Sequence, residues 1–345
     1  TVKKSSADKN LGLLDIILGL QWTQNEIGAF GGDKNRVSIM GHSSGAQGVD
    51  QLAISPKTAG LFRQVIVMSG PVGMIELRRD ANLNQSRTMA ISAGCATEDL
   101  WNAGDSFEEI LQCLRRKPVA ELVNVQREIE NTGQSFEGPM IDDADGVLPE
   151  NSTALLRKRR PYQMLIGTTN REFRVAAMLV NSDGEISKPL LYIMCIFMAK
   201  TRGLKHPLAV GRACADDYSK RPSDIPDLVD DVLIYLPTYD SSEAMRAKKA
   251  VVYKYSFEYS KIGEAFLGKE ASSVPGPFHA QDLVYVMGLH YNKFTPKDQQ
   301  IRKVYSGVFA DFVISGDPSP PTHREKWQPT DDRNNYFRID FDDNM

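Results

Sequence analysis

A five-residue segment, Gly41-His42-Ser43-Ser44-Gly45, separates two stretches of opposite character. The residues before it, Val37-Ser38-Ile39-Met40, form a short apolar run typical of a buried β-strand. The residues after it, from Ala46 to about Ala53, are mostly small and favour a helix. The segment therefore predicts a sharp turn from strand to helix, with Ser43 at its tip.

A serine in such a turn is placed to act as a nucleophile. Glycines two positions before and after it, Gly41 and Gly45, allow neighbouring backbone to come close. The helix that follows directs its first N–H groups toward the place where a negatively charged oxygen would develop during acyl transfer. The alternative is a Gly/Ser turn without chemistry. The strand and helix on either side favour the nucleophile.

Further strand candidates alternate with helical segments along the chain. A helix is expected from Leu11 to Ile27, and a mainly helical region from 176 to 240 includes an apolar run at 190–198 that we expect to be a buried helix. The segment 266–278 is loop-like. The strand candidates are 64–68, 164–167, 251–257 and, as an edge strand, 336–341. Strands joined through helices predict a parallel sheet with helices on its faces, within one domain covering 1–345.

The composition narrows the class of partner. Of 345 residues, 41% are hydrophobic and 25% are charged, which is ordinary for a globular enzyme. A net charge of −3 leaves no positive surplus to neutralise phosphates, which argues against a nucleic-acid partner. The basic runs at 157–160 and 248–249 are interpreted as solvated faces. No apolar run reaches the roughly 18 residues of a transmembrane helix.

Four cysteines bear on the compartment. Cys95 and Cys113 lie in a polar segment between helical patterns, which is compatible with a small disulfide loop or with two unpaired thiols. Cys195 and Cys214 lie in apolar or helical surroundings, and we expect them to be buried free thiols, with a disulfide as the alternative.

Two other features also concern the compartment. The sequence begins at Thr1 without a charged and apolar leader, so any secretion signal is expected to lie upstream or to have been removed. Sequons beginning at Asn84 and Asn151 are compatible with a secreted glycoprotein.

Several segments around the turn form a recognisable signature. Those ahead of it are Asn10-x-Gly12-Leu13-x-Asp15, Leu20-x-Trp22, Asn25-x-Ile27 and Phe30-Gly31-Gly32-Asp33-x-x-x-Val37. Those after it are Ser69-Gly70, Gly138-Pro139, Pro149, the strand at Val251, Trp327 and Tyr336. Together they resemble the type-B carboxylesterase and cholinesterase family over nearly the whole chain. The resemblance implies an α/β-hydrolase fold, with a mostly parallel central sheet and helices on both faces, and a serine hydrolase that cleaves carboxylic esters.

The resemblance also implies a catalytic triad. A serine nucleophile needs a histidine to take its proton and a carboxylate to orient that histidine, in the chain order serine, acid, histidine. His279 lies in a Gly/Pro-rich loop after the longest strand and matches the family's histidine, with Ala280-Gln281-Asp282-Leu283 following. Glu172 matches the acid and follows Gly167 at the family's interval, although Phe173 stands where the family usually has glycine. The alternatives are a surface-loop histidine and a glutamate in a surface ion pair.

Further roles follow from the same resemblance. Ser44 supplies a backbone N–H to the oxyanion, Ser69 hydrogen-bonds the acid, and Cys95 and Cys113 match a family disulfide. His42 stands where the family commonly has glutamate, and in such a turn we expect its side chain to point away from the nucleophile.

The family's domain is longer at its N-terminus, where it builds several strands and a glycine-rich loop that donates other oxyanion N–H groups. We therefore expect the N-terminal part of the domain to be missing here and the strand near Val37 to be an exposed edge. We also expect this chain alone to hydrolyse esters at least about 100-fold more slowly than the complete domain. The alternative function is a cholinesterase-like binding or adhesion module with little or no catalysis.

No cofactor or metal is expected. The segment Asp142-Asp143-x-Asp145-Gly146 lacks the full ligand pattern of a calcium loop and is interpreted as a polar turn, and nothing has zinc-ligand spacing. The expected partners are a small-molecule ester and either a missing N-terminal segment or a second copy of the chain. The expected location is outside the cell or in the lumen of the secretory pathway.

Overall fold

The computed structural model describes residues 9–79, 82–134, 136, 138–173, 187–262, 276–319 and 326–341. The chain forms two compact units. The helical unit comprises residues 1–16 and 77–151, and the sheet unit comprises residues 17–76 and 152–345. That both belong to one α/β-hydrolase domain stays a prediction from the sequence.

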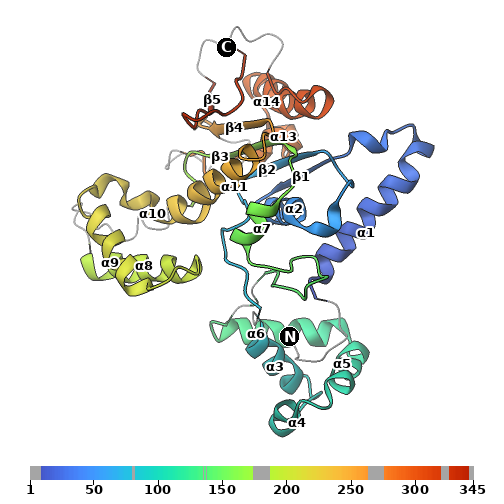
Figure 1. The fold of residues 1–345 in the computed structure, drawn as a ribbon. Helices are drawn as coiled ribbons and strands as arrows, with labels where there is room; N and C mark the ends of the chain where they lie inside the picture. The colour runs from blue at the N-terminus through green and yellow to red at the C-terminus, as the bar shows by residue number, and fades with distance from the viewer. Residues whose placement is uncertain are drawn as a thin grey trace. The chain divides into compact units, whose positions relative to one another are not determined.

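Parallel strands form the centre of the sheet unit (Figure 1). In the described part of the chain they are β1 (Ser38–His42), β2 (Gln64–Met68), β3 (Gln163–Thr169), β4 (Val252–Phe257) and β5 (Phe337–Ile339). Their order in space is their order in the chain, and each pair is parallel. The carboxyl ends of all the strands therefore meet at one edge of the sheet, where sites in such folds gather. The strands predicted from the sequence are confirmed, and β1 and β5 form the two outer positions.

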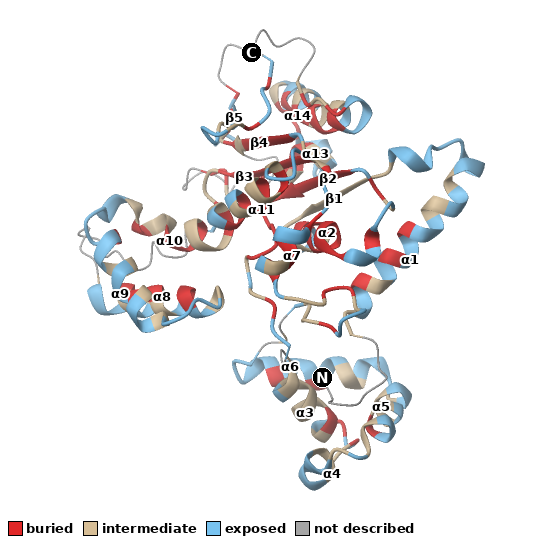
Figure 2. Ribbon diagram, in the orientation of Figure 1, coloured by how far each residue is buried: buried red, intermediate tan, exposed pale blue. Residues whose placement is uncertain are grey.

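Helices cover both faces of this sheet, so the inner strands β2 and β3 are buried along nearly their whole length, whereas the outer strand β1 is only partly buried. The helices of the sheet unit are α2 (Ser44–Ile54), α7 (Ser152–Lys158), α8 (Lys188–Thr201), α9 (Pro207–Tyr218), α10 (Leu228–Asp230), α11 (Leu236–Arg246), α13 (Leu283–Met287) and α14 (Pro296–Ser315). Figure 2 shows the buried residues concentrated in the strands and in the sides of the helices that face them. The predicted class, a parallel sheet between helices, is confirmed.

Side chains along β4 point alternately to opposite faces of the sheet. Tyr253, Tyr255 and Phe257 pack into an aromatic and aliphatic core together with side chains of α13 and α14. Successive side chains of a strand point to opposite faces, so Lys254 lies on the other face. On that face α11 packs against β3 and β4.

The helical unit contains α3 (Leu83–Ser92), α4 (Glu98–Ala103), α5 (Phe107–Arg116) and α6 (Val119–Asn131), and α1 (Leu11–Glu26) contributes residues to both units. A disulfide joins Cys95 to Cys113 with their Cα atoms 5.6 Å apart, as the family resemblance implies. Asp142 accepts hydrogen bonds from the N–H groups of Val147 and Leu148. The acidic segment at 142–146 is thus a polar turn held by its own backbone.

Two expectations about α8 are wrong. Cys195 is not a free thiol, because it forms a disulfide with Cys214 of α9, with Cα atoms 5.9 Å apart. The helix is also not buried all round: Leu191 is buried, whereas Ile193 and Phe197 are exposed. An apolar run of nine residues can form a helix with one buried and one exposed face. The apolar composition of the run does not show which of its side chains are exposed.

No helix among the described residues is long and apolar enough to cross a membrane. The loop predicted at 266–278 lies mostly outside the described residues.

A buried ion pair connects helices on the α11 side of the sheet. Arg159, just after α7, lies 2.9 Å from the carboxylate of Asp50 in α2, and both side chains are fully buried. The hydroxyl of Ser241 in α11 and the N–H of Val72 also donate to Asp50, at 2.8 and 2.9 Å. The interpretation of 157–160 as a solvated face is therefore wrong for Arg159, although its neighbours 157, 158 and 160 are exposed.

Arg159→Met should lower the free energy of unfolding by about 3–5 kcal/mol, because it leaves the Asp50 carboxylate buried without its counter-ion. Arg160→Met, one residue away and exposed, is the matched control and should change the free energy by less than about 0.5 kcal/mol. Chemical denaturation measures both. Equal changes in the free energy of unfolding for the two substitutions would show that the Asp50–Arg159 pair does not stabilise the fold.

Candidate active site

The turn predicted at Ser43 is present between β1 and α2. Ser43 has φ 55° and ψ −124°, a backbone conformation that is strained for a residue with a side chain. Its N–H donates to the carbonyl of Met68 at 2.9 Å, and its carbonyl accepts from the N–H of Gln47 at 2.9 Å. These hydrogen bonds hold the strained residue between the strand edge and the first turn of the helix.

Close backbone approaches explain which glycines the turn requires. A Cβ atom on Gly41 would lie 2.2 Å from the carbonyl oxygen of Gly45, and one on Gly70 would lie 2.1 Å from that of Ser43. A Cβ on Gly45 itself would meet nothing within 4 Å among the described residues. The turn at Ser43 therefore requires glycine at positions 41 and 70. Gly70 lies outside the Gly-x-Ser-x-Gly segment.

Gly70→Ala should displace Ser43 and lower the rate at which a fluorophosphonate probe labels its hydroxyl by about 100-fold or more, the order expected when a reacting group moves by about 1 Å. Gly48→Ala is the control, because a Cβ there meets no atom of another described segment within 4 Å and the residue lies inside α2. It should keep the labelling rate and stabilise the protein by up to about 1 kcal/mol through helix propensity. Mass spectrometry of the labelled peptide and thermal unfolding measure the two effects; a wild-type labelling rate in Gly70→Ala would contradict this account.

The structure brings together the three residues that the sequence selects as a triad. His279 Nε2 lies 2.7 Å from Ser43 Oγ, and His279 Nδ1 lies 2.6 Å from Glu172 Oε2. Both distances are within hydrogen-bond reach. Glu172 is buried, and its other carboxylate oxygen accepts the N–H of Thr169 at the end of β3, at 2.9 Å. The N–H of His279 also donates to the carbonyl of Glu172, at 2.9 Å, so acid and base are tied through backbone and side chain.

The family resemblance implies supporting roles at the site for Ser44, through its backbone N–H, and for Ser69, through its hydroxyl. Ser44 is the first residue of α2 and is exposed, and the first N–H groups of a helix have no partner within it. Ser69, in contrast, does not hydrogen-bond Glu172. Its Oγ is buried and has no hydrogen-bond partner among the described residues, while the carboxylate of Glu172 accepts from Thr169 and pairs with His279. The predicted bond from Ser69 is therefore wrong.

Two aromatic rings pack against the triad histidine, and the sequence indicated neither contact. The ring centroids of His42 and His279 are 4.7 Å apart, so the expectation that His42 points away is wrong. The ring of Phe173 lies 4.4 Å from that of His279. The N–H of Phe173 donates to the carboxylate of buried Asp230 at 2.9 Å. Phe173 thus occupies the position of the family's glycine without separating Glu172 from His279.

The site also contains titrating groups outside the triad. Burial, followed by the nearby charge of His279, lowers the pKa of His42 to about 4. Its Nε2 atom is buried without a partner among the described residues, which suits a neutral ring. Burial and then the charge of Glu172 raise the pKa of Asp282 to about 7, and Asp282 accepts a hydrogen bond from Tyr305 at 3.0 Å.

His42 should make the protein sensitive to moderate acid. An unfolded histidine takes up a proton near its ordinary pKa of 6.5, whereas folded His42 does so only near 4. The unfolded state therefore binds more protons between these values, and stability falls as the pH is lowered through this window. Thermal unfolding between pH 7 and 4 should show a steeper loss of stability in the wild type than in His42→Gln. Parallel pH profiles would rule out this role.

Comparison with known proteins identifies the family. A model described as the carboxylesterase family matches residues 1–345. The chain belongs to the carboxylesterase family. This confirms the resemblance seen in the sequence, and it agrees with the serine turn, the parallel sheet and the Ser43–His279–Glu172 arrangement described above.

Carboxylesterases of known sequence and structure share only part of their residues with this chain. Carboxylesterase 1C of Rattus norvegicus is 26% identical over 96% of the chain, and Carboxylesterase 5A of Felis catus is 29% identical over 90%. A solved PNB esterase superposes with a TM-score of 0.72, covering 96% of the chain at 22% identity, which supports the fold. The chain spans 60% and 57% of the two curated relatives and 65% of the solved chain.

Proposed function

We propose that this carboxylesterase-family protein hydrolyses carboxylic esters of small molecules through an acyl-serine intermediate. The observation that carries the proposal is the pair of hydrogen bonds of His279, at 2.7 Å to the Ser43 hydroxyl and at 2.6 Å to the buried Glu172 carboxylate. A nucleophile within reach of a base that is itself oriented by an acid is the arrangement that acyl transfer requires.

Each residue has a distinct part in the proposed reaction. Ser43 Oγ attacks the ester carbonyl while His279 Nε2 takes the serine proton. The resulting imidazolium, stabilised by Glu172 at Nδ1, gives that proton to the departing alkoxide, which leaves as an alcohol. A water molecule, deprotonated by His279, then attacks the acyl-serine and releases the carboxylic acid and free Ser43. The N–H of Ser44 stabilises the oxyanion that forms in both steps.

A fluorophosphonate probe should label the intact protein at Ser43, and Ser43→Ala should abolish labelling. Ser44→Ala is the matched control, because it keeps the backbone N–H, and it should retain labelling within about tenfold of the wild-type rate. Labelling is followed by mass spectrometry of the modified peptide. Labelling that persists in Ser43→Ala would overturn the assignment of the nucleophile.

Glu172→Gln should lower the turnover of an aryl ester by up to about 10⁴-fold, because an amide neither fixes the required tautomer of His279 nor stabilises the imidazolium. The result also separates the proposed esterase from a module that binds without catalysis. A folded wild-type protein that neither labels nor turns over esters would favour the binding module.

We further propose that the protein functions in an oxidising compartment. Two disulfides support this, since such bonds persist mainly in secreted and luminal proteins. Both sequon asparagines, Asn84 and Asn151, are exposed.

A further inference from the structure

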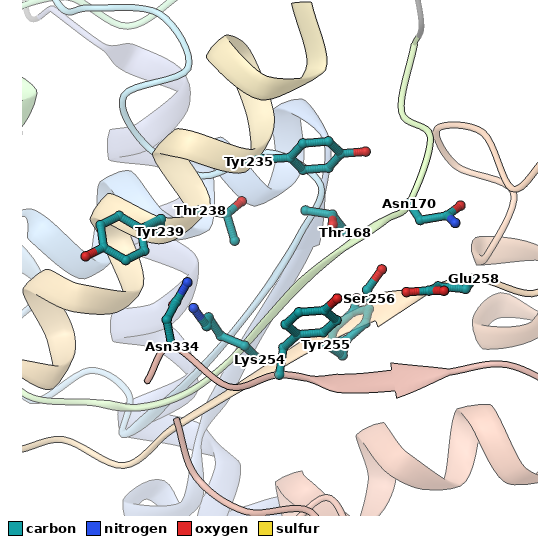
Figure 3. A pocket seen from close by; sticks show the side chains of 11 residues that line it. Thr168, Asn170, Tyr235, Thr238, Tyr239, Lys254, Tyr255, Ser256, Glu258 and Asn334 are labelled. Carbon is teal, nitrogen blue, oxygen red and sulfur yellow. The ribbon is translucent and has the colours of Figure 1, made fainter. Parts of the chain in front are cut away.

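The sheet unit contains a cavity that is separate from the triad. It has a volume of about 320 Å³ and lies on the α11 face of the sheet, near the ends of β3 and β4 (Figure 3). Tyr239 and Tyr336, both in its lining, are 43% and 57% exposed, so the cavity is accessible from solvent. Neither Ser43 nor His279 lines it.

A buried lysine side chain distinguishes this cavity. Lys254 of β4 is only 6% exposed, and Figure 3 shows it extending toward Tyr239 and Asn334. No described residue accepts a hydrogen bond from its ammonium group, which lies 5.7 Å from the centroid of the Tyr239 ring. An anion that entered the cavity would therefore gain a charge-assisted hydrogen bond from this ammonium without having to displace a carboxylate.

Glu243 and Glu258, two carboxylates of this region, already form ion pairs with arginines. Glu258, which lines the cavity, lies 2.6 Å from Arg338. Glu243 raises the pKa of Lys254 through its charge, but it forms a close pair with Arg246, 3.0 Å away. The largest influence on the pKa of Lys254 is burial, which lowers it. Each acid is therefore matched by an arginine, and the lysine is the unmatched charge of the cavity.

The rest of the lining indicates what kind of anion would fit. Tyr235 and Tyr239 present aromatic rings, which suit an apolar body. One ammonium and aromatic walls together match a ligand with one negative charge and an apolar body.

We propose that this cavity binds a small aromatic monocarboxylate, with its carboxylate on Lys254 and its ring against the tyrosines of the lining. The site is independent of the proposed esterase reaction, because none of the triad residues lines it. An inorganic phosphate is a poorer match, since the cavity offers a single cationic side chain.

Binding is tested in the intact protein carrying Ser43→Ala, so that acyl transfer plays no part. Titration calorimetry with 4-hydroxybenzoate should show binding, and the uncharged 4-hydroxybenzamide should bind at least about tenfold more weakly. Lys254→Met should lower the affinity for the carboxylate at least about tenfold, as expected for loss of a charge-assisted hydrogen bond. Lys57→Met, which removes an exposed lysine outside the cavity, is the control and should bind normally.

Equal binding of the acid and the amide, or unchanged binding by folded Lys254→Met, would overturn the proposal. If Lys254→Met does not fold, the wild-type protein supplies the test. There, 4-hydroxybenzoate should slow the reaction of the Lys254 amine with an acylating reagent, followed by peptide mass spectrometry, while Lys57 reacts at an unchanged rate. Absence of protection at Lys254 would also overturn the proposal.

Discussion

Close approach of backbone to backbone at one strand end is the constraint on which the site depends. Gly41 lets β1 pass against the carbonyl of Gly45, and Gly70 lets the end of β2 lie against the carbonyl of Ser43. Any side chain at Gly41 or Gly70 would collide with backbone, which cannot move aside as a flexible side chain can. The strained φ of Ser43 persists because two neighbouring segments enforce it, as strain at functional sites generally requires.

The parallel sheet then assembles the remaining chemistry at the same edge. β1 leads into Ser43, and β3 leads into Thr169, whose N–H positions Glu172. His279 follows β4 and meets both side chains, although it lies 236 and 107 residues away from them. The same strand ends also form a wall of the cavity around Lys254. Two sites of different chemistry thus share strands β3 and β4.

The sheet unit contains a buried ion pair and a largely buried lysine that has no ion-pair partner among the described residues. Asp50 and Arg159 are both fully buried, and each satisfies the other. Lys254 is 6% exposed as a residue, and its ammonium contacts the ring of Tyr239 but forms no ion pair with a described carboxylate. The Asp50–Arg159 pair joins helices on one face of the sheet, so we assign it a structural role. The ammonium of Lys254 can form an ion pair with a ligand, so we assign binding to its cavity.

The sequence alone determined the strands, the parallel class of the sheet and the position of Ser43, because apolar periodicity and the Gly-x-Ser-x-Gly segment are local. Family resemblance selected His279 and Glu172. Tertiary structure decided the contacts between distant segments. His42 packs against His279, and the Oγ of Ser69 has no partner in the described part of the chain. Tertiary structure also decided the burial of Arg159 within a run of exposed basic residues. Periodicity assigns side chains to faces, but only packing between distant segments determines which partners they meet there.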